Sequence, residues 1–198
     1  FHDYRALSSV FADAAAWWRP QLNLADETGD PVRVSAVETT ENLFDVLGVP
    51  PAMGRGFTVH AGLFGGEHEA IISHRLWNTR FGGDSGVIGR AIRLNGFTYT
   101  VVGIMPPGFG FPGETDLWQQ LQWDLHFHSR GAHFMESVAR LAPGVTADRA
   151  NRELAALGVR LGNEFRGTNA GWTPKVIELD RETAGVFRPG LFALFGAS

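Results

Sequence analysis

Apolar and polar residues alternate over short stretches of this chain, and turns rich in glycine or proline separate the stretches. The segment "VRVSAV" is the clearest case, because Val32, Val34 and Ala36 alternate with polar neighbours as in a half-buried strand. Further extended segments are predicted at residues 12–18, 70–72, 133–141 and from 173, with an edge strand or crossover at 116–121. Strands are therefore expected along most of the chain.

Three segments combine helical spacing of apolar residues with recognisable helix ends. Thr39 or Thr40 is expected to cap a short helix that ends at Gly48, where a left-handed residue closes the last turn. Ser73 is expected to cap a second helix that two glycines end. The longest helix follows Thr146, and its buried face is predicted to carry Leu154, Leu157, Leu161 and Phe165.

A glycine-rich stretch, "LNGFTYTVVGIMPPGFGFP", begins with the dipeptide Asn95-Gly96. This dipeptide predicts a two-residue hairpin turn, because both residues tolerate the positive φ that such a turn needs. The expected cross-strand pairs are Leu94 with Phe97 and Ile92 with Tyr99. The later glycines lack the lysine, hydroxyl or helix start of a phosphate-binding loop. We interpret the stretch as a structural hairpin with a rigid exit.

The mixture of strands and helices places the chain in the α+β class. Its 198 residues, 44% of them hydrophobic, suffice to bury a core and suit one large domain or two small lobes. With 17 basic and 21 acidic residues the net charge is -4, which argues against nucleic acid as a partner. The chain has no cysteine, which excludes thiol catalysis, disulfides and thiolate metal sites.

The segment "HFHSRGAH" is the strongest chemical candidate, because His126, His128 and His133 lie close together in sequence. Two or three imidazoles with one carboxylate can hold zinc. A second segment, "GEHE", would supply the carboxylate from Glu67 or Glu69, with His68 as a further candidate ligand. The alternative is a solvated loop rich in histidine, since no H-E-x-x-H helix accompanies these residues. No catalytic or cofactor-binding residue is expected.

Trp17 and Trp18 are adjacent in a predicted extended segment, so their side chains should point to opposite sides. Both cannot enter one core, and one of them is a candidate interface residue.

The end of the chain, "PGLFALFGAS", is strongly apolar. Two interpretations are open: the start of a truncated transmembrane helix at 187–198, or a terminal strand or helix that packs on the core. No uninterrupted apolar window in the chain reaches the roughly 20 residues needed to cross a bilayer.

Three separated blocks resemble the MacB-like periplasmic domain of ABC transporter permeases, especially the large duplicated permeases of Acidobacteria and their relatives. They are "TTENLFDVLGVPPAMGRGF", "AIISHRLWNTRFGGDSGVIGRAIRLNGFTYTVVGIMPPGFGFP" and "VARLAPGVTADRANRELAAL". The resemblance implies a two-lobed fold. A mixed α/β porter-like lobe is expected at 1–48 and 123–186, a β-rich Sabre-like lobe inserted at 49–122, and the approach to a membrane helix at 187–198.

The resemblance also implies a function. The domain is expected to be non-catalytic and to lie at the periplasmic face of a bacterial inner-membrane permease, where it transmits ATP-driven change to export or signalling. Its expected partners are the rest of the permease and an ABC ATPase, with a second copy or a periplasmic protein as further candidates. A peptide- or lipid-binding module and a zinc-dependent hydrolase remain as alternatives.

Overall fold

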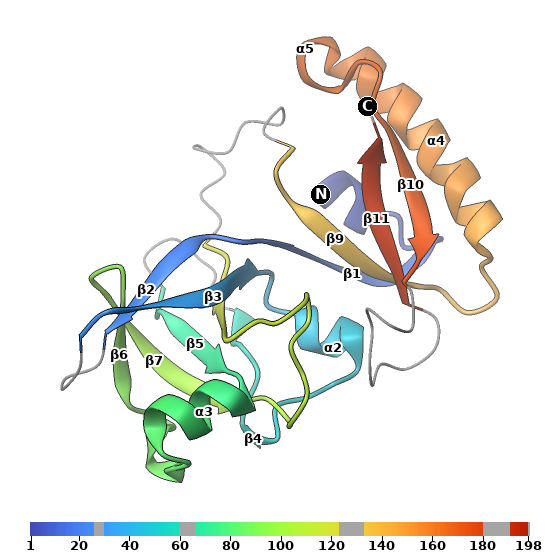
Figure 1. Ribbon diagram of the computed structural model, residues 1–198. Helices are drawn as coiled ribbons and strands as arrows, with labels where there is room; N and C mark the ends of the chain where they lie inside the picture. The colour runs from blue at the N-terminus through green and yellow to red at the C-terminus, as the bar shows by residue number, and fades with distance from the viewer. Residues whose placement is uncertain (26–29, 60–65, 123–132, 180–190, 198) are drawn as a thin grey trace.

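The computed structural model describes residues 1–25, 30–59, 66–122, 133–179 and 191–197 (Figure 1). Its helices are α1 (His2–Arg5), α2 (Leu43–Leu47), α3 (His74–Phe81), α4 (Ala147–Glu164) and α5 (Arg166–Asn169), with a 3-10 turn η2 (Ser85–Val87). Its strands are β1 (Phe11–Trp18), β2 (Gln21–Ala25), β3 (Val32–Thr39), β4 (Met53–Gly54), β5 (Glu69–Ile72), β6 (Ala91–Leu94), β7 (Phe97–Ile104), β8 (Leu117–Gln120), β9 (Glu136–Leu141), β10 (Thr173–Glu178) and β11 (Leu191–Ala197). The α+β prediction is confirmed.

Six strands pair in a closed ring. The order is β3, β2, β6, β7, β5 and β8, and a parallel pairing of β8 with β3 closes it. We call this ring the barrel. Its interior is an apolar cluster that includes Leu22, Leu24, Ile92, Leu94 and Leu117, and α3 packs against this cluster through Leu76 and Phe81.

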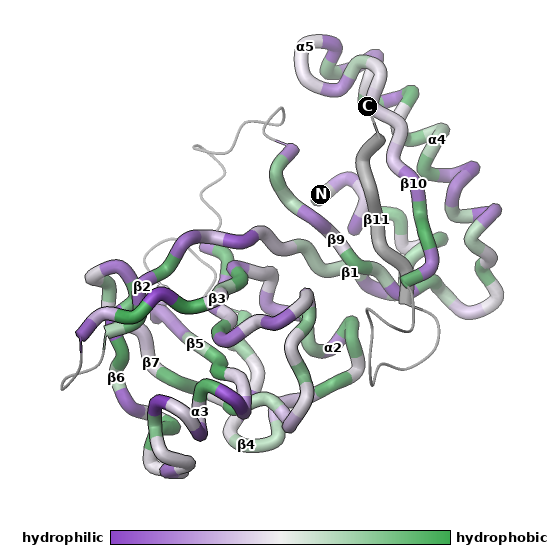
Figure 2. The backbone as a smooth tube through the Cα atoms, viewed as in Figure 1, coloured by the Kyte–Doolittle hydropathy of each residue, from purple (hydrophilic) through white to green (hydrophobic). Residues whose placement is uncertain are grey.

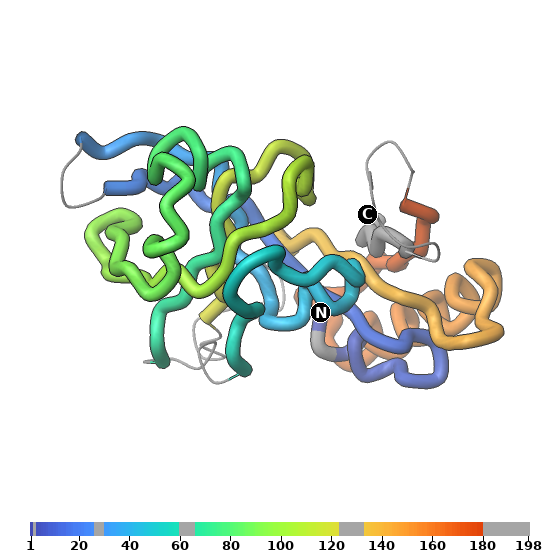
Figure 3. The backbone as a smooth tube through the Cα atoms, turned by 90° about the horizontal axis from the view of Figure 1, so that it is seen from below, coloured from blue at the N-terminus to red at the C-terminus, as the bar shows by residue number. Residues whose placement is uncertain are grey.

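The short strand β4 pairs with β7, and the other four strands form an open extension of the same sheet, in the order β10, β11, β9 and β1. The helix α4 runs along β10 and covers a second apolar cluster with Ala150 and Leu154 (Figure 1). We call this group, with α1 and α5, the α4 half. Figure 3 shows the barrel and the α4 half side by side, with α2 between them.

A third apolar cluster joins the two groups. It combines residues on the outer side of the barrel, such as Val37 and Trp118, with Ala15 and Val138 of β1 and β9. Most residues of the helix α2 belong to this cluster. Figure 2 shows the hydrophobic character of α2 and of β7. The core of the molecule is therefore continuous from the barrel to the α4 half.

The alanine run in β1 explains how β1 is covered on both faces. Ala14 and its neighbour Ala139 face α4, whereas Ala15 and its neighbour Val138 face the joining cluster. Small side chains let helices approach the strand from both sides. Ala14, Ala15 and Ala16 are all fully buried.

The predicted hairpin is confirmed. Leu94 pairs with Phe97 and Ile92 with Tyr99. Asn95 and Gly96 both have positive φ, 48° and 90°. The local pattern and turn chemistry are enough to predict this element.

The helix caps agree with the sequence at two of three N-termini. The Ser73 side chain accepts a hydrogen bond from the Leu76 N–H, and Thr146 accepts one from the Arg149 N–H. The expected cap at Thr39 or Thr40 was wrong, because α2 begins after Asn42 without a side-chain cap. Both threonine side chains instead bond to the backbone of β1. Gly48 ends α2 in the left-handed conformation, as predicted.

The structure decides two segments that the sequence left open. The segment at 116–121 is not an edge strand: β8 lies between β3 and β5 and is buried throughout. Of the two interpretations open for the end of the chain, residues 191–197 agree with the terminal strand, because they form β11 and not the start of a helix. The physical reason is that β9 and β10 offer backbone partners on both sides of this segment. Among the described helices, none is both long and apolar enough to span a bilayer.

The lobe boundaries at 48/49 and 122/123 stay a prediction. The barrel takes β2 and β3 from the first 48 residues and its other four strands from residues 49–122.

Candidate functional site

The structure draws attention to the joint between the barrel and the α4 half, where β1 changes partner. Residues Phe11 to Trp17 pair with β9, and Trp17 and Trp18 pair with β3. Trp17 is opposite Glu136 on one side and Thr39 on the other. The strand β1 therefore belongs to both groups.

Threonine side chains complete the hydrogen bonding where the β1–β3 ladder ends. The Thr39 hydroxyl donates to the Ala16 carbonyl at 3.0 Å, and the Thr40 N–H donates to the same carbonyl at 3.0 Å. The Ala16 N–H donates to Thr40 Oγ1 at 3.2 Å. Both threonines are buried, so these bonds are made away from water.

Asn42 connects this end of β3 to the start of β1. Its Nδ2 donates to Asp13 Oδ2 at 2.8 Å and to the Ala14 carbonyl at 3.0 Å, and its Oδ1 accepts from the Thr40 hydroxyl at 2.8 Å. Arg5 completes the group, because it lies 3.4 Å from Asp13 and 3.2 Å from Glu41. The side-chain amide of Asn42 is thus fully used within the protein.

A second polar contact reaches the joint from β9. Arg140 Nη2 donates to the Val46 carbonyl in α2 at 2.7 Å. A guanidinium is favourable beside a carbonyl near a helix C-terminus. The helix α2 is therefore tied to the α4 half by a charged hydrogen bond and to the barrel by apolar packing.

This polar group was not predicted from the sequence. Its signal was the run "TTEN", four polar residues between a strand and a helix. We interpreted the threonines as caps. The threonines' partners in β1 are 23 and 24 positions away, a separation along the chain that local patterns do not report.

Trp17 and Trp18 point to opposite sides, as predicted. Trp17 is 3% exposed and meets Phe111 edge to face at 5.1 Å. Its indole N–H has no hydrogen-bond partner among the described residues. Trp18 is half-buried and meets Phe134 edge to face at 5.6 Å. A role for Trp17 or Trp18 at an interface stays a prediction.

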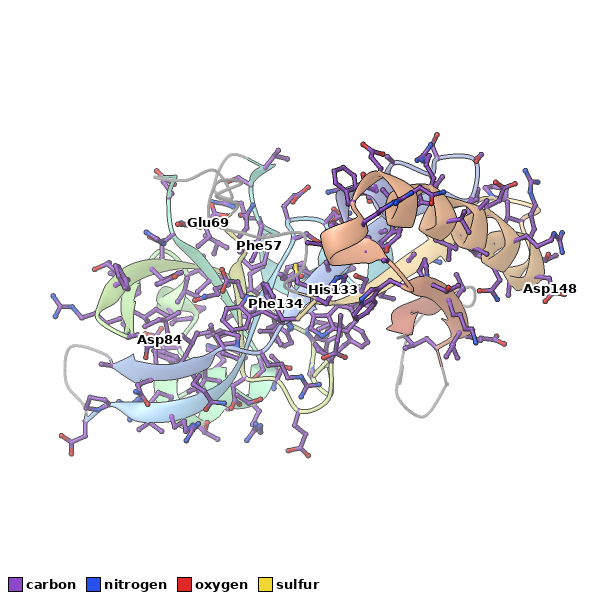
Figure 4. All side chains as sticks on the ribbon, turned by 90° about the horizontal axis from the view of Figure 1, so that it is seen from above. Phe57, Glu69, Asp84, His133, Phe134 and Asp148 are labelled. Carbon is purple, nitrogen blue, oxygen red and sulfur yellow. The ribbon has the colours of Figure 1, made fainter. Side chains whose placement is uncertain are left out.

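The histidine candidates are only partly placed, because His126 and His128 lie outside the described residues. The ring of His133 stacks on Trp172, with centroids 3.7 Å apart, and its Nε2 lies 2.9 Å from the Thr168 carbonyl (Figure 4). The part of the chain that the structure describes contains no group of three side chains suited to a metal ion.

The candidates Glu67, His68 and Glu69 do not act as one ligand set. Glu69 is 1% exposed, and its carboxylate meets Arg55 Nη2 at 2.6 Å and the Thr58 N–H at 2.9 Å. The hydrogen bond that Arg55 donates to Glu69 raises the pKa of Arg55. His68 packs against Tyr99 instead, and Glu67 is exposed.

A comparison with protein families identifies the chain's relatives. The profile of the MacB-like periplasmic core domain matches residues 2–157, which is most of the chain. The chain belongs to this MacB-like family. It is accordingly a periplasmic or extracellular domain of an ABC transporter permease, and the resemblance noted in the sequence is confirmed. No curated protein matches the chain.

Solved structures share the fold of this MacB-like domain at low sequence identity. The extracellular domain of the noncanonic ABC-type transporter YknZ from Gram-positive bacteria has a TM-score of 0.60 and 18% identity, with 85% of each chain covered. The periplasmic region of MacB from Actinobacillus actinomycetemcomitans has a TM-score of 0.62 and 14% identity, covering 85% of this chain and 75% of that one. A domain of a protein described as a permease from Porphyromonas gingivalis has a TM-score of 0.58 and 16% identity, covering 95% and 73%.

Proposed function

We propose that this MacB-like domain is a non-catalytic transmission element, which carries ATP-driven movement of its permease to export or signalling at the periplasmic face. The observation that supports the proposal best is the shared strand β1. Its backbone pairs with β9 of the α4 half and with β3 of the barrel. A displacement applied to one group is therefore passed to the other through backbone hydrogen bonds.

The joint has the physical properties that transmission requires. Packed interiors are stiff, because small displacements of close-packed side chains already cost dispersion energy. The joining cluster places α2 against both groups, and Asn42 and Arg140 add buried or half-buried hydrogen bonds. Bending the joint would break these bonds in surroundings where water replaces them poorly.

The proposal includes partners that act outside this chain. They are the rest of the permease, which tethers the domain to the bacterial inner membrane, and an ABC ATPase on the cytoplasmic side. A second copy or a periplasmic protein would receive the movement. The zinc-dependent alternative gains nothing from Glu69, because that carboxylate is already paired with Arg55.

A fluorescence experiment on the full-length permease with its ATPase tests the proposal. The present chain has no cysteine, so Asp84→Cys or Asp148→Cys introduces one dye site into this domain. Figure 4 shows these residues at opposite ends of the molecule. The acceptor dye is placed in the surrounding lipid. Energy transfer from each of the two sites to the lipid should change when ATP is hydrolysed, because the domain moves as one body.

Two controls make the result decisive. A donor dye at position 84 with an acceptor dye at position 148 reports the distance within the domain, and this distance should stay constant if the joint is stiff. An ATPase variant that binds but does not hydrolyse ATP should abolish the change at both membrane-referenced sites. Constant energy transfer throughout the ATP cycle would refute a transmission role.

A further inference from the structure

One end of the barrel is polar, although the rest of its interior is apolar. Gln119 of β8 is opposite Ala70 of β5 and beside Glu38 of β3. Ala36, Ala70 and Leu117 belong to the interior cluster, and side chains two residues apart share one face of a strand. Glu38 and Gln119 therefore occupy inward-facing positions at this end.

Aromatic rings surround the same end. Phe97 and Tyr99 share one face of β7, and Tyr99 packs against the interior cluster. The His68 ring lies 4.8 Å from Tyr99 and 6.3 Å from Phe97, measured between centroids. Gln122 Nε2 lies 3.0 Å from His68 Nδ1, which fixes the orientation of the imidazole. Phe97 is 64% exposed, so this aromatic group opens to the solvent.

Glu38 brings a carboxylate to this end of the barrel. Burial, and secondarily the charge of Glu38, raise the pKa of Tyr99 to about 12. Tyr99 therefore remains a neutral phenol at physiological pH, and its ring presents a negative face to any cation beside it.

Gln119 supplies the observation that points to a ligand. Gln119 is 6% exposed, and its Oε1 accepts no hydrogen bond from any described residue. A buried carbonyl oxygen without a donor costs about 1–3 kcal/mol. Such an oxygen calls for a donor that the described part of the chain does not provide.

We propose that this end of the barrel binds a small organic ammonium ion. Its N–H groups would donate to Gln119 Oε1 and to the Glu38 carboxylate, and its alkyl part would pack on the rings of Tyr99, Phe97 and His68. An acceptor oxygen, a carboxylate and aromatic faces together favour a cation and disfavour an anion. Glu38 pairs with Trp18 of β1, so this site adjoins the joint, but the binding of an ammonium ion does not depend on the transmission role.

Calorimetric titration of the 198-residue chain with n-butylammonium chloride tests the proposal. Saturable binding is expected, whereas sodium butyrate, the anion of similar size, should give none. Tetramethylammonium has no N–H donor and should bind more weakly than n-butylammonium. Equal heats for the ammonium ion and for butyrate, or no saturable heat for either, would overturn the proposal.

Two substitutions locate the site. Gln119→Met removes the acceptor at similar volume and should weaken binding about threefold to tenfold, the range of one hydrogen bond. Glu38→Gln keeps the shape and removes the charge, and it should weaken binding about tenfold or more. Asp148→Asn removes an exposed carboxylate of the distant α4 and should bind as the parent chain does.

Circular dichroism and thermal melting check that each variant is folded. If Gln119→Met does not fold, the affinity of the Glu38→Gln variant tests the proposal on its own. This variant should fold, because the half-buried Glu38 side chain is replaced by one of the same shape. Parent-like affinity in the folded Glu38→Gln variant would refute the proposal.

Discussion

Glu69 shows how one residue can look like a ligand in the sequence and be a structural residue in the fold. Its carboxylate is almost fully buried, and it accepts hydrogen bonds from Arg55 and from the N–H and hydroxyl of Thr58. A buried carboxylate is tolerated only when it is paired and hydrogen-bonded. Arg55 therefore matters less as a surface cation than as the partner that makes the burial of Glu69 acceptable.

Replacing Arg55 tests this interpretation. Arg55→Met leaves the carboxylate with the Thr58 donors alone and should lower the free energy of unfolding by about 1–2 kcal/mol. This decrease in unfolding free energy is smaller than that expected for a fully buried ion pair, because the Arg55 side chain is 50% exposed and water replaces part of the contact. Urea denaturation followed by circular dichroism measures the change.

Arg90→Met is the matched control. Arg90 pairs with Asp84 at 3.4 Å, and both side chains are about half exposed. Removing this pair should change the unfolding free energy by less than about 0.5 kcal/mol. Equal losses in the two variants would show that the burial of Glu69 adds nothing to its ion pair.

The hairpin of β6 and β7 has a turn that the local sequence predicts and hydrogen bonds to a neighbouring strand that it does not predict. The turn itself was predictable, but the side chain of Asn95 has a second function. Its Oδ1 accepts from the Asn23 N–H at 2.9 Å, and its Nδ2 donates to the Gln21 carbonyl at 3.0 Å. These bonds extend the short ladder between β6 and β2, so one turn residue helps to close the barrel.

A graded pair of substitutions tests this closure. Asn95→Gly keeps the positive φ but removes both side-chain bonds, and it should lower stability by about 1–2 kcal/mol. Asn95→Asp keeps the acceptor and loses the donor, so its loss should be smaller. Hydrogen exchange at the Asn23 amide should accelerate most in Asn95→Gly. Unchanged exchange there would show that the β2–β6 ladder holds without Asn95.

The helices and turns were predictable because their signals are local. Ser73 and Thr146 cap helices three residues away, and Gly48 ends α2 within one turn. Thr40 was misjudged because its partners lie in β1, and β8 was misjudged because a parallel neighbour closes the barrel around it. The pairing of Glu69 with Arg55 and the polar end of the barrel also depend on distant strands. Local patterns thus predicted elements, and the sites required the fold.

At the scale of the whole molecule, the barrel and the α4 half share too much structure to unfold separately. They have one hydrogen-bonded sheet in common, and the joining cluster contains residues of both, such as Trp118 and Val138. Opening the α4 half would expose part of that cluster and remove the β9 partner of β1. The cost of opening one group therefore includes the loss of contacts that stabilise the other.

We therefore expect a single cooperative unfolding transition, which hydrogen exchange in increasing urea can test with reporters in β5 and β9. Leu154→Ala removes a fully buried side chain beneath α4 and should cost about 2–5 kcal/mol. It should lower the protection of both reporters by the same amount. The reciprocal substitution Ile92→Ala, inside the barrel, should do so as well. Loss of protection confined to the group that carries the substitution would show that the joint does not couple the two groups. Such a joint would be too compliant to transmit movement from the permease.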